Sequence, residues 1–352
     1  MVQLKFGKAA NKTRTMYTRL QNISGQMLEI RLQKDVKGHS VGWDFDILPY
    51  TIKQGCTTYI GAAPASGKTE LWFEFLINTS CLHNWNHVVF SPETGSAAEI
   101  YAELCHKYIG KPYHLMTQGE QVTAEMFVNQ HFVVIDPIEE DLTIEKFYDL
   151  VDEIERKEDI TIHTTTIDPW NELTEEFKHS DLGREDKYLS RILNLVRKNA
   201  RKTGRHNCII NHVRDQPMTT SKTIAGTDIS YFPIPTARDF AGGQVWFRKG
   251  LSVLIPWRPP YGLADSNGVG AEMNEVHLKV AKSKPKGVSK NGVYKLYLDI
   301  DKYQYYMLDD NGRRIYANRN NTPKPPTQTR IIETDGLMST SEKLKLKNNL
   351  PF

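Results

Sequence analysis

The segment with the clearest chemistry is Ala62-Ala63-Pro64-Ala65-Ser66-Gly67-Lys68-Thr69. It follows a strand-like run at 57–60 and precedes a helix-like run that begins at Glu70. A strand, a loop of small residues, Gly-Lys-Thr and a helix form the layout of a phosphate-binding P-loop. Backbone N–H groups and the helix N-terminus then point at phosphate oxygens. Lys68 would reach the β- and γ-phosphates of ATP, and the Thr69 hydroxyl would hold Mg²⁺.

One position departs from the usual GxxxxGK[ST] pattern. Ala62 stands where the first glycine is expected, and Gly61 lies one residue earlier. The alternative interpretation is a plain strand, turn and helix with a chance Gly-Lys-Thr. The flanking elements favour the P-loop.

A P-loop enzyme needs a second acid for magnesium, which we expect at the end of a neighbouring strand. Asp136 follows the apolar run 132–135, and Asp168 follows the β-branched run 162–167. A helix-like segment, 143–157, separates the two acids, so they end different strands. Spacing alone leaves the choice between them open. The other acid would keep a turn or helix-capping role.

Glu93 is the candidate carboxylate that orients or deprotonates the attacking water. It follows the strand 87–91, which we place beside the P-loop strand, so its side chain would face the phosphates. The alternative is that Glu93 only caps the helix that begins near Ser96. Asn211-His212 follows a further strand, 208–210, and a polar side chain at this place can sense the γ-phosphate. From position alone, however, a lone histidine is more often structural.

Composition bounds the class of protein. The chain has 352 residues, 25% charged and 39% hydrophobic, with a net charge of +3. These values are ordinary for a globular protein, so any nucleic-acid binding must come from local patches. The four cysteines have no zinc-site spacing and predict reduced thiols in the cytoplasm. No signal sequence and no run of 18 apolar residues is present, which predicts no membrane partner.

The pattern from His39 to about Asp310 alternates short apolar runs with helix-like runs at 70–82, 96–109, 143–157 and 186–203. Such alternation predicts an α/β fold with a mainly parallel twisted sheet covered by helices on both faces. Ligands of such sheets lie at the carboxyl ends of the strands. The segments 276–280 and 294–298 alternate like antiparallel strands.

We predict three parts of the chain: an N-terminal helical arm at 1–38, an ATPase domain at 39–317, and a mostly disordered tail at 318–352. The arm should contain one or two short amphipathic helices broken near Ser24-Gly25. Inside the domain, the polar stretch 213–238 is predicted to be a long functional loop. The many basic residues of 184–205 are predicted to form the solvated face of a helix.

The ordered motifs together resemble the helicase domain of the DnaB/Twinkle class of ring-shaped replicative helicases, over about 39–310. The segments that carry the resemblance are Gly42-Trp43-Asp44, the P-loop with its Ala-x-Pro-x-x-Gly-Lys-Thr form, Phe90-Ser91-Pro92-Glu93, Tyr108-Ile109-Gly110-Lys111-Pro112, Ile135-Asp136-Pro137, Ile167-Asp168-Pro169-Trp170, Ile210-Asn211-His212 and Asp239-Phe240-Ala241-Gly242-Gly243. The resemblance favours Asp168 as the magnesium acid and His212 as the γ-phosphate sensor.

The resemblance implies RecA-like subunits in a ring, usually of six copies, with ATP bound between neighbours. Loops that face the channel would grip single-stranded DNA, and by position they include part of 213–238. Arg214 and Lys222 would contact phosphates there in a salt-dependent way. We expect no zinc-binding or primase module ahead of the helicase domain in this sequence, so a primase or polymerase would act in trans.

One departure concerns the Lys-x-Arg pair that the class presents to a neighbour's γ-phosphate. The matching residues are Lys282-Ser283-Lys284, so Lys284 replaces the arginine finger. Lysine supplies charge but not the planar fork. Turnover would then be slow, or Lys286 or Arg258 would serve instead.

The sequence therefore predicts an ATP-driven DNA helicase. Two alternatives stay open: a RecA-like strand-exchange recombinase, which would form filaments, and a remodelling ATPase that needs no DNA.

Overall fold

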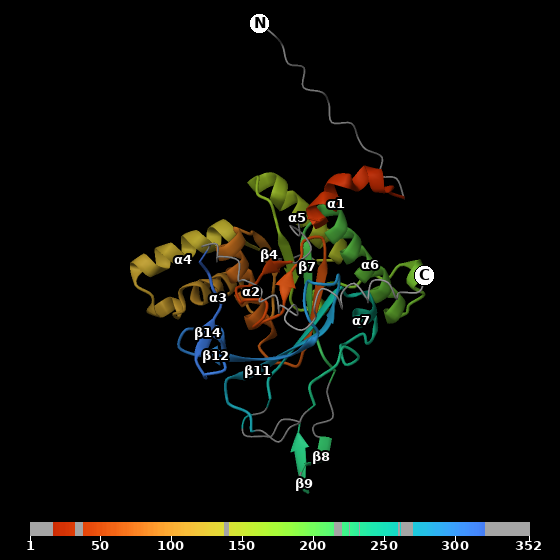
Figure 1. The fold of residues 1–352 in the computed structure, drawn as a ribbon. Coiled ribbons are helices and arrows are strands. Elements are labelled where there is room, and N and C mark those ends of the chain that lie inside the picture. The colour runs from red at the N-terminus through yellow and green to blue at the C-terminus, as the bar shows by residue number, and fades with distance from the viewer. Residues whose placement is uncertain are drawn as a thin grey trace, which may run out of the picture. The chain divides into compact units, whose positions relative to one another are not determined.

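The computed structural model describes residues 17–31, 38–136, 141–214, 220–224, 226–231, 233–259, 261 and 270–320 (Figure 1). Within these residues ten strands form one sheet in the order β14-β13-β12-β11-β10-β3-β7-β6-β4-β5. The strands of this sheet are β3 (Thr57–Ala62), β4 (His87–Phe90), β5 (Phe132–Val134), β6 (Thr164–Ile167), β7 (His206–His212), β10 (Ser252–Trp257), β11 (Glu275–Ser283), β12 (Gly292–Asp299), β13 (Gln304–Leu308) and β14 (Arg314–Tyr316). A short pair, β1 (His39–Ser40) and β2 (Thr51–Ile52), forms a separate ladder.

The strands from β10 to β5 in this order are all parallel, and those from β10 to β14 are antiparallel. The predicted α/β class, with a mainly parallel sheet and antiparallel strands at its C-terminal end, is therefore confirmed. All the parallel strands present their carboxyl ends at one edge, which we call the P-loop edge because β3 ends there.

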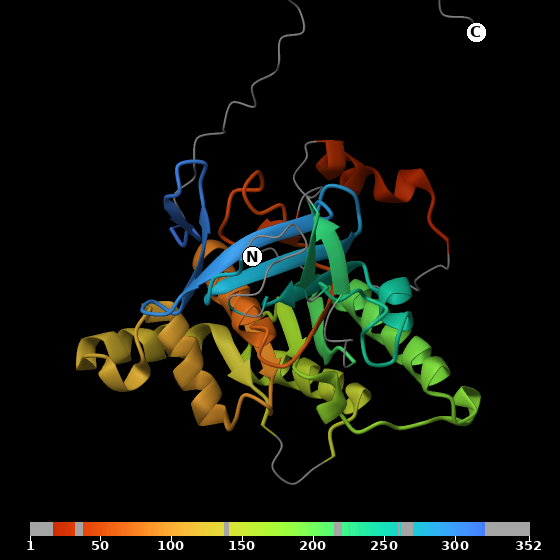
Figure 2. The ribbon, with the colours of Figure 1, turned by 90° about the horizontal axis from the view of Figure 1, so that it is seen from below.

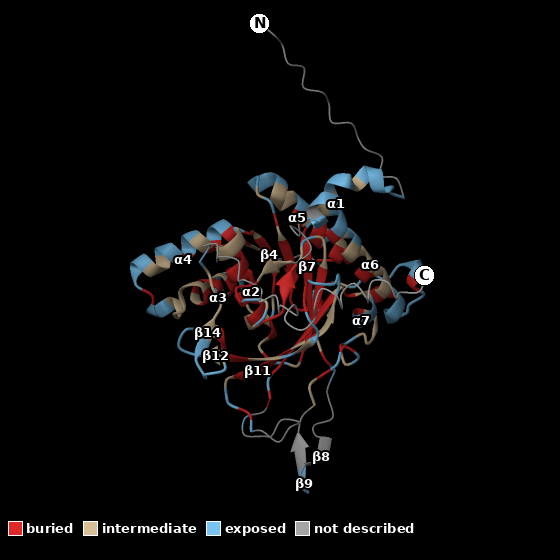
Figure 3. Cartoon of the chain, in the orientation of Figure 1, coloured by how far each residue is buried: buried red, intermediate tan, exposed pale blue. Residues whose placement is uncertain are grey.

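Helices cover both faces of the sheet, as Figures 1 and 2 show. The helices are α2 (Lys68–His83), α3 (Ala97–Ile109), α4 (Gln118–His131), α5 (Ile144–Glu158), α6 (Glu185–Thr203) and α7 (Val245–Lys249). The side chains of α2, α3 and α4 share a core with Ile60, whereas those of α5, α6 and α7 share a core with Tyr59. Adjacent residues of β3 thus feed opposite cores, because side chains alternate along a strand. Burial is concentrated in these two layers (Figure 3).

Each predicted helix matches an observed one to within two residues at either end. Helix α4 was not predicted, because only Ala124, Val128 and His131 along its 14 residues are buried and its apolar pattern is weak. Its N-terminus is nevertheless encoded locally: Thr117 and Glu120 form a reciprocal capping box.

The predicted loop at 213–238 is partly regular. It contains a two-stranded hairpin, β8 (Thr220–Ile224) and β9 (Thr227–Tyr231), within the predicted functional loop. The N-terminal arm contains a 3₁₀ turn, η1 (Leu20–Ile23), joined to α1 (Ser24–Arg31), close to the predicted break.

Contacts with the domain continue past residue 317. Asn318 donates its N–H to the carbonyl of Gly42 over 2.7 Å. The Arg319 guanidinium donates to Glu74 and Asn78 of α2 and to the carbonyl of Lys107. These contacts fasten Asn318 and Arg319 to the domain, while the rest of the predicted tail, from 321, lies outside the described residues.

Candidate nucleotide site

Two glycines shape the P-loop. Gly67 has a φ of +76°, which favours glycine, and a Cβ there would come within 2.7 Å of the Tyr305 hydroxyl. A Cβ on Gly61 would lie 2.1 Å from the Phe240 ring, so only glycine fits. Gly61 is therefore needed because the Phe240 ring packs directly against it. Ala62, the last residue of β3, does not have a positive φ, so glycine is not required at that position. Lys68 begins α2 and is buried.

Asp168 and Thr69 meet at the P-loop edge. The Thr69 hydroxyl donates to Asp168 Oδ2 over 2.6 Å, and the Ser91 hydroxyl donates to the same oxygen over 3.3 Å. Asp168 follows β6, which is separated from β3 by β7. The expectation that the acid ends a strand directly beside the P-loop strand is therefore wrong, although the carboxylate reaches Thr69.

The second oxygen of this carboxylate is a candidate metal ligand. Asp168 Oδ1 is buried and has no hydrogen-bond partner. A buried oxygen without a partner is costly, and a hard cation would satisfy it. The residues present therefore fit Mg²⁺, with Thr69 and Asp168 as the protein's donors and the remaining ligands drawn from phosphate and water.

Burial raises the pKa of the Asp168 carboxyl above its ordinary value, and the negative charge of Glu93 adds to this. The hydrogen bond from Thr69 and the charge of Lys68 act in the opposite direction. A buried acid whose pKa is raised by burial and opposed by specific charged neighbours is typical of a functional site.

Asp136, the other candidate acid, has a capping role. Its Oδ2 accepts the N–H of Ala97, the first residue of α3, over 2.9 Å. The acid that does not serve the phosphate site was expected to have a turn or helix-capping role. For Asp136 that expectation is confirmed.

Glu93 and His212 are in contact across the P-loop edge. His212 Nε2 lies 3.0 Å from Glu93 Oε1, and because a carboxylate can only accept, the imidazole is the donor. The alternative role of Glu93 as a helix cap is wrong: Ser96 is the N-cap of α3, in a capping box with Glu99. The placement of β4 beside β3 is also wrong, since β7 and β6 lie between them.

His212 lies next to the P-loop. It ends β7, which pairs with β3, and in that register His212 is opposite Ala62. The segment behind it holds it in place, because Ala241 donates its N–H to the His212 carbonyl and accepts from Asn211 Nδ2. The topology therefore brings Lys68, Thr69, Asp168 and a Glu93–His212 pair to one edge.

Two cavities border the P-loop. One of about 280 Å³ is lined by Ser66, Gly67, Glu70, Arg258 and Tyr303, among others, and we call it the nucleoside cavity. A second, of about 420 Å³, is lined by Ala63–Ser66 and by Trp257, Arg258 and Tyr261. Sequence reasoning missed Tyr303, which comes from the turn between the antiparallel strands β12 and β13, far along the chain from the loop. It named Arg258 only as a substitute for the arginine finger, whereas Arg258 follows β10 and lines both cavities beside its own P-loop.

Comparison with known proteins supports the fold. No family model and no curated protein matches the sequence. A solved structure of an ATPase domain matches with a TM-score of 0.58 at 14% identity, over 85% of this chain and 98% of that one. A solved structure of a DnaB-like replicative helicase, which concerns its interactions with primase, also matches with a TM-score of 0.58 at 14% identity. This match covers 83% of this chain and 67% of that one.

The chain has the fold of a DnaB-like helicase ATPase domain. The resemblance predicted from the motifs is thereby confirmed for the RecA-like domain. Among the described residues, no helix is long and apolar enough to cross a membrane.

In this DnaB-like fold, Lys282 and Lys284 lie far from their own P-loop. Ser283 pairs with Ser252, which in turn pairs with Thr58 near the start of β3. That is the edge opposite the P-loop edge. Lys284 is exposed, whereas Lys282 donates to the carbonyls of Phe247 and Arg248 at the end of α7.

The predicted DNA-binding residues lie in two places. Arg214 follows β7 at the P-loop edge and donates its N–H to the Asp239 carbonyl. Lys222 lies in β8, opposite Ile229 of β9. The structure thus separates a residue beside the nucleotide site from one on a hairpin.

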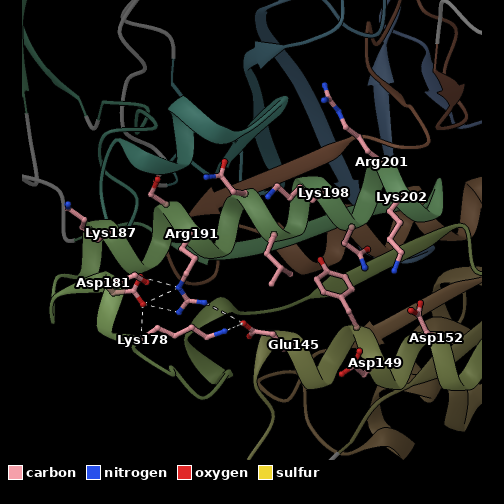
Figure 4. A pocket seen from close by; sticks show the side chains of 16 residues that line it. Glu145, Asp149, Asp152, Lys178, Asp181, Lys187, Arg191, Lys198, Arg201 and Lys202 are labelled. Carbon is pink, nitrogen blue, oxygen red and sulfur yellow. Dashed lines mark hydrogen bonds and ion pairs between the residues drawn. The ribbon is translucent and has the colours of Figure 1, made fainter. Parts of the chain in front are cut away.

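A larger groove of about 1220 Å³ lies between α5 and α6 (Figure 4). Its α6 wall carries the basic residues predicted as a solvated face, and its α5 wall carries acids. Arg191 is paired with Asp181 at 2.9 Å and with Glu145 at 3.4 Å. The Arg191–Glu145 pair joins α6 to α5, whereas Asp181 belongs to the 3₁₀ turn η4 (His179–Asp181).

Proposed function

We propose that this chain is a subunit of an ATP-dependent DNA helicase that translocates on single-stranded DNA as a ring, usually of six copies. The observation that carries the proposal is the convergence at one edge of two pairs, Thr69–Asp168 and Glu93–His212, around a P-loop. The DnaB-like fold supports the same conclusion at the level of architecture.

The residues divide the work of hydrolysis. Lys68 and the loop N–H groups would bind the phosphates, and Thr69 and Asp168 would hold Mg²⁺, which would supply positive charge against the phosphates. Glu93 accepts a proton from water as the water oxygen bonds to the γ-phosphorus. The bond from that phosphorus to the β–γ bridging oxygen then breaks, which releases ADP.

The contact between His212 and Glu93 gives the site two arrangements. In this structure His212 Nε2 donates its hydrogen bond to Glu93 Oε1. A γ-phosphate oxygen near Ala62 would compete for that donor and leave Glu93 to take the water proton. His212 would then report the presence of the γ-phosphate to the catalytic carboxylate.

The lysine pair is proposed to act on another copy of the chain. Lys284 lies at the edge opposite its own P-loop, so it has no route to its own nucleotide. In a head-to-tail ring the two edges of neighbouring copies face each other. Lys284 would therefore contribute positive charge to a neighbour's γ-phosphate. Lys282, which contacts the end of α7, would position the end of β11, which Lys284 directly follows.

DNA and replication partners complete the proposal. Arg214 and Lys222 would bind phosphates of single-stranded DNA, with an affinity that falls as salt rises. One structural neighbour is described together with a primase. A primase or a polymerase is accordingly the partner proposed to act in trans.

The test is unwinding of a forked duplex, with particle images in a non-hydrolysable ATP analogue. ATP-dependent unwinding with closed rings is the expected result. Filaments on DNA without unwinding would move the assignment to a strand-exchange recombinase. Hydrolysis that ignores DNA would move it to a remodelling ATPase.

A further inference from the structure

A buried lysine lies behind the nucleoside cavity. Lys107 is in the last turn of α3, and its side chain is 0% exposed. Its ammonium lies 2.8 Å from Glu70 Oε2 and donates to the Tyr303 carbonyl over 3.3 Å. It also lies 4.2 Å from the centre of the Tyr303 ring. Burying a charge is unfavourable unless it is paired, so these contacts are the reason that Lys107 is tolerated there.

The two partners of Lys107 belong to two different walls of the cavity. Glu70 is the third residue of α2, two residues after Lys68, and Tyr303 lies in the turn between β12 and β13. Both line the nucleoside cavity, together with the P-loop residues Ser66 and Gly67. Lys107 is thus a bridge between the P-loop helix and the wall contributed by the antiparallel strands.

Tyr303 needs such support. Its φ is +54°, a left-handed conformation that is unfavourable for a residue with a side chain. The Lys107 ammonium holds its carbonyl, and the His106 ring stacks on its ring at 4.2 Å. Neighbouring residues of α3 therefore fix both the backbone and the ring of Tyr303.

We propose that Lys107 is a positioning residue for the nucleoside part of ATP: it holds Tyr303 against Glu70 and so fixes the wall of the cavity beside the P-loop. This inference rests on the proposed nucleotide function and deepens it. The proposal divides the site into two parts. Phosphate binding by the P-loop does not depend on Lys107, whereas nucleoside binding in the cavity does.

The experiment compares Mg²⁺-ATP with inorganic triphosphate as ligands of the full chain, by calorimetry, in wild type and Lys107→Met. Loss of the wall should weaken ATP binding roughly tenfold, as expected for one cation–π and ion-pair arrangement. Binding of inorganic triphosphate should stay within about twofold, because the loop that binds phosphate is unchanged. In hydrolysis assays KM for ATP should rise more than kcat falls.

Two further variants keep the test decisive. Lys111→Met removes a lysine that is paired with Glu120 at 2.9 Å on the surface, and it should change neither ligand's binding. Tyr303→Leu keeps the Lys107–Glu70 pair but removes the ring, and it should reproduce the ATP-specific loss even if Lys107→Met does not fold.

The outcomes separate the two proposals. Equal weakening of both ligands, or no weakening of either, in Lys107→Met and Tyr303→Leu would overturn the positioning role while leaving the nucleotide site standing. A wild-type chain that binds neither ATP nor inorganic triphosphate would instead overturn the proposed function itself.

Discussion

Thr69 and Asp168, 99 residues apart in the sequence, are joined by a 2.6 Å hydrogen bond from the threonine hydroxyl to the carboxylate. The contact joins the first turn of the P-loop helix to the end of a strand two positions away in the sheet. It leaves Asp168 Oδ1 buried and without a partner. This arrangement is what a magnesium site needs before the metal and phosphate arrive.

The first prediction concerns Asp168→Asn. The amide keeps the size of the side chain but removes the charge, so Mg²⁺-dependent hydrolysis should fall by about a hundredfold or more. Because burial raises the pKa of the native carboxyl, the neutral amide should cost no stability at neutral pH. Hydrolysis rates and thermal unfolding measure the two effects. A variant that hydrolyses ATP within about twofold of wild type would remove Asp168 from the site.

The second prediction concerns Glu93→Gln. The amide cannot accept the water proton, so turnover should fall roughly 10²–10⁴-fold, the range for loss of a general base. ATP binding should persist, because Lys68 and the loop are intact. Single-turnover hydrolysis and equilibrium binding are the measurements. Glu158→Gln, an exposed acid at the end of α5, is the matched control. Equal turnover in both variants would count against the role of Glu93.

The third prediction concerns the lysine pair and uses mixed assemblies. Lys68→Ala and Lys284→Ala should each be inactive alone, because each lacks one half of a shared site. When they are mixed, about a quarter of the interfaces should combine an intact Lys68 with an intact Lys284 from a neighbour. Hydrolysis should then recover to a similar fraction of wild type. If the mixture stays as inactive as its components, Lys284 does not act between subunits.

The fourth prediction concerns pH and His206, which is buried at the start of β7. Its Nδ1 donates to the Lys53 carbonyl, and its Nε2 accepts from the Thr58 hydroxyl. Burial lowers the pKa of His206 to about 4. The unfolded chain, with a pKa near 6.5, then binds more protons than the folded chain between about pH 6.5 and 4. Stability is therefore full above about pH 6.5 and falls as the pH drops.

The expected loss is about 3 kcal/mol by pH 4, since each pKa unit corresponds to about 1.4 kcal/mol. Urea unfolding at about pH 7.5, 5.5 and 4.5 measures it. His206→Gln should flatten part of this slope, and the remainder would come from groups such as His87, whose pKa is also lowered by burial. A slope that is identical in wild type and His206→Gln would contradict the assignment.

Local signals explain what could be predicted from the sequence. The P-loop and its helix follow from a strand, small residues and Gly-Lys-Thr in direct succession. Helices α5 and α6 follow from strong amphipathic patterns. Asp168, Glu93 and His212 were candidates because each stands within two residues of the end of a strand-like run, and the parallel sheet brings those positions to one edge. The resemblance to the helicase class then favoured Asp168 and His212.

Non-local pairing explains what could not be predicted. The order β3-β7-β6-β4 depends on which strands hydrogen-bond, and no local pattern records it. The placement of Glu93 beside the P-loop strand failed for this reason. Tyr303 reaches the nucleoside cavity from the turn between β12 and β13, and Lys107 lies behind it on α3, so neither residue carried a motif that points to nucleotide binding.

The most direct measurement is the rate of Mg²⁺-ATP hydrolysis with and without single-stranded DNA, in wild type and Lys68→Ala. The account predicts hydrolysis by wild type, clear stimulation by DNA, and loss of both in Lys68→Ala. Equal rates in the two proteins, or no hydrolysis by wild type under either condition, would contradict it.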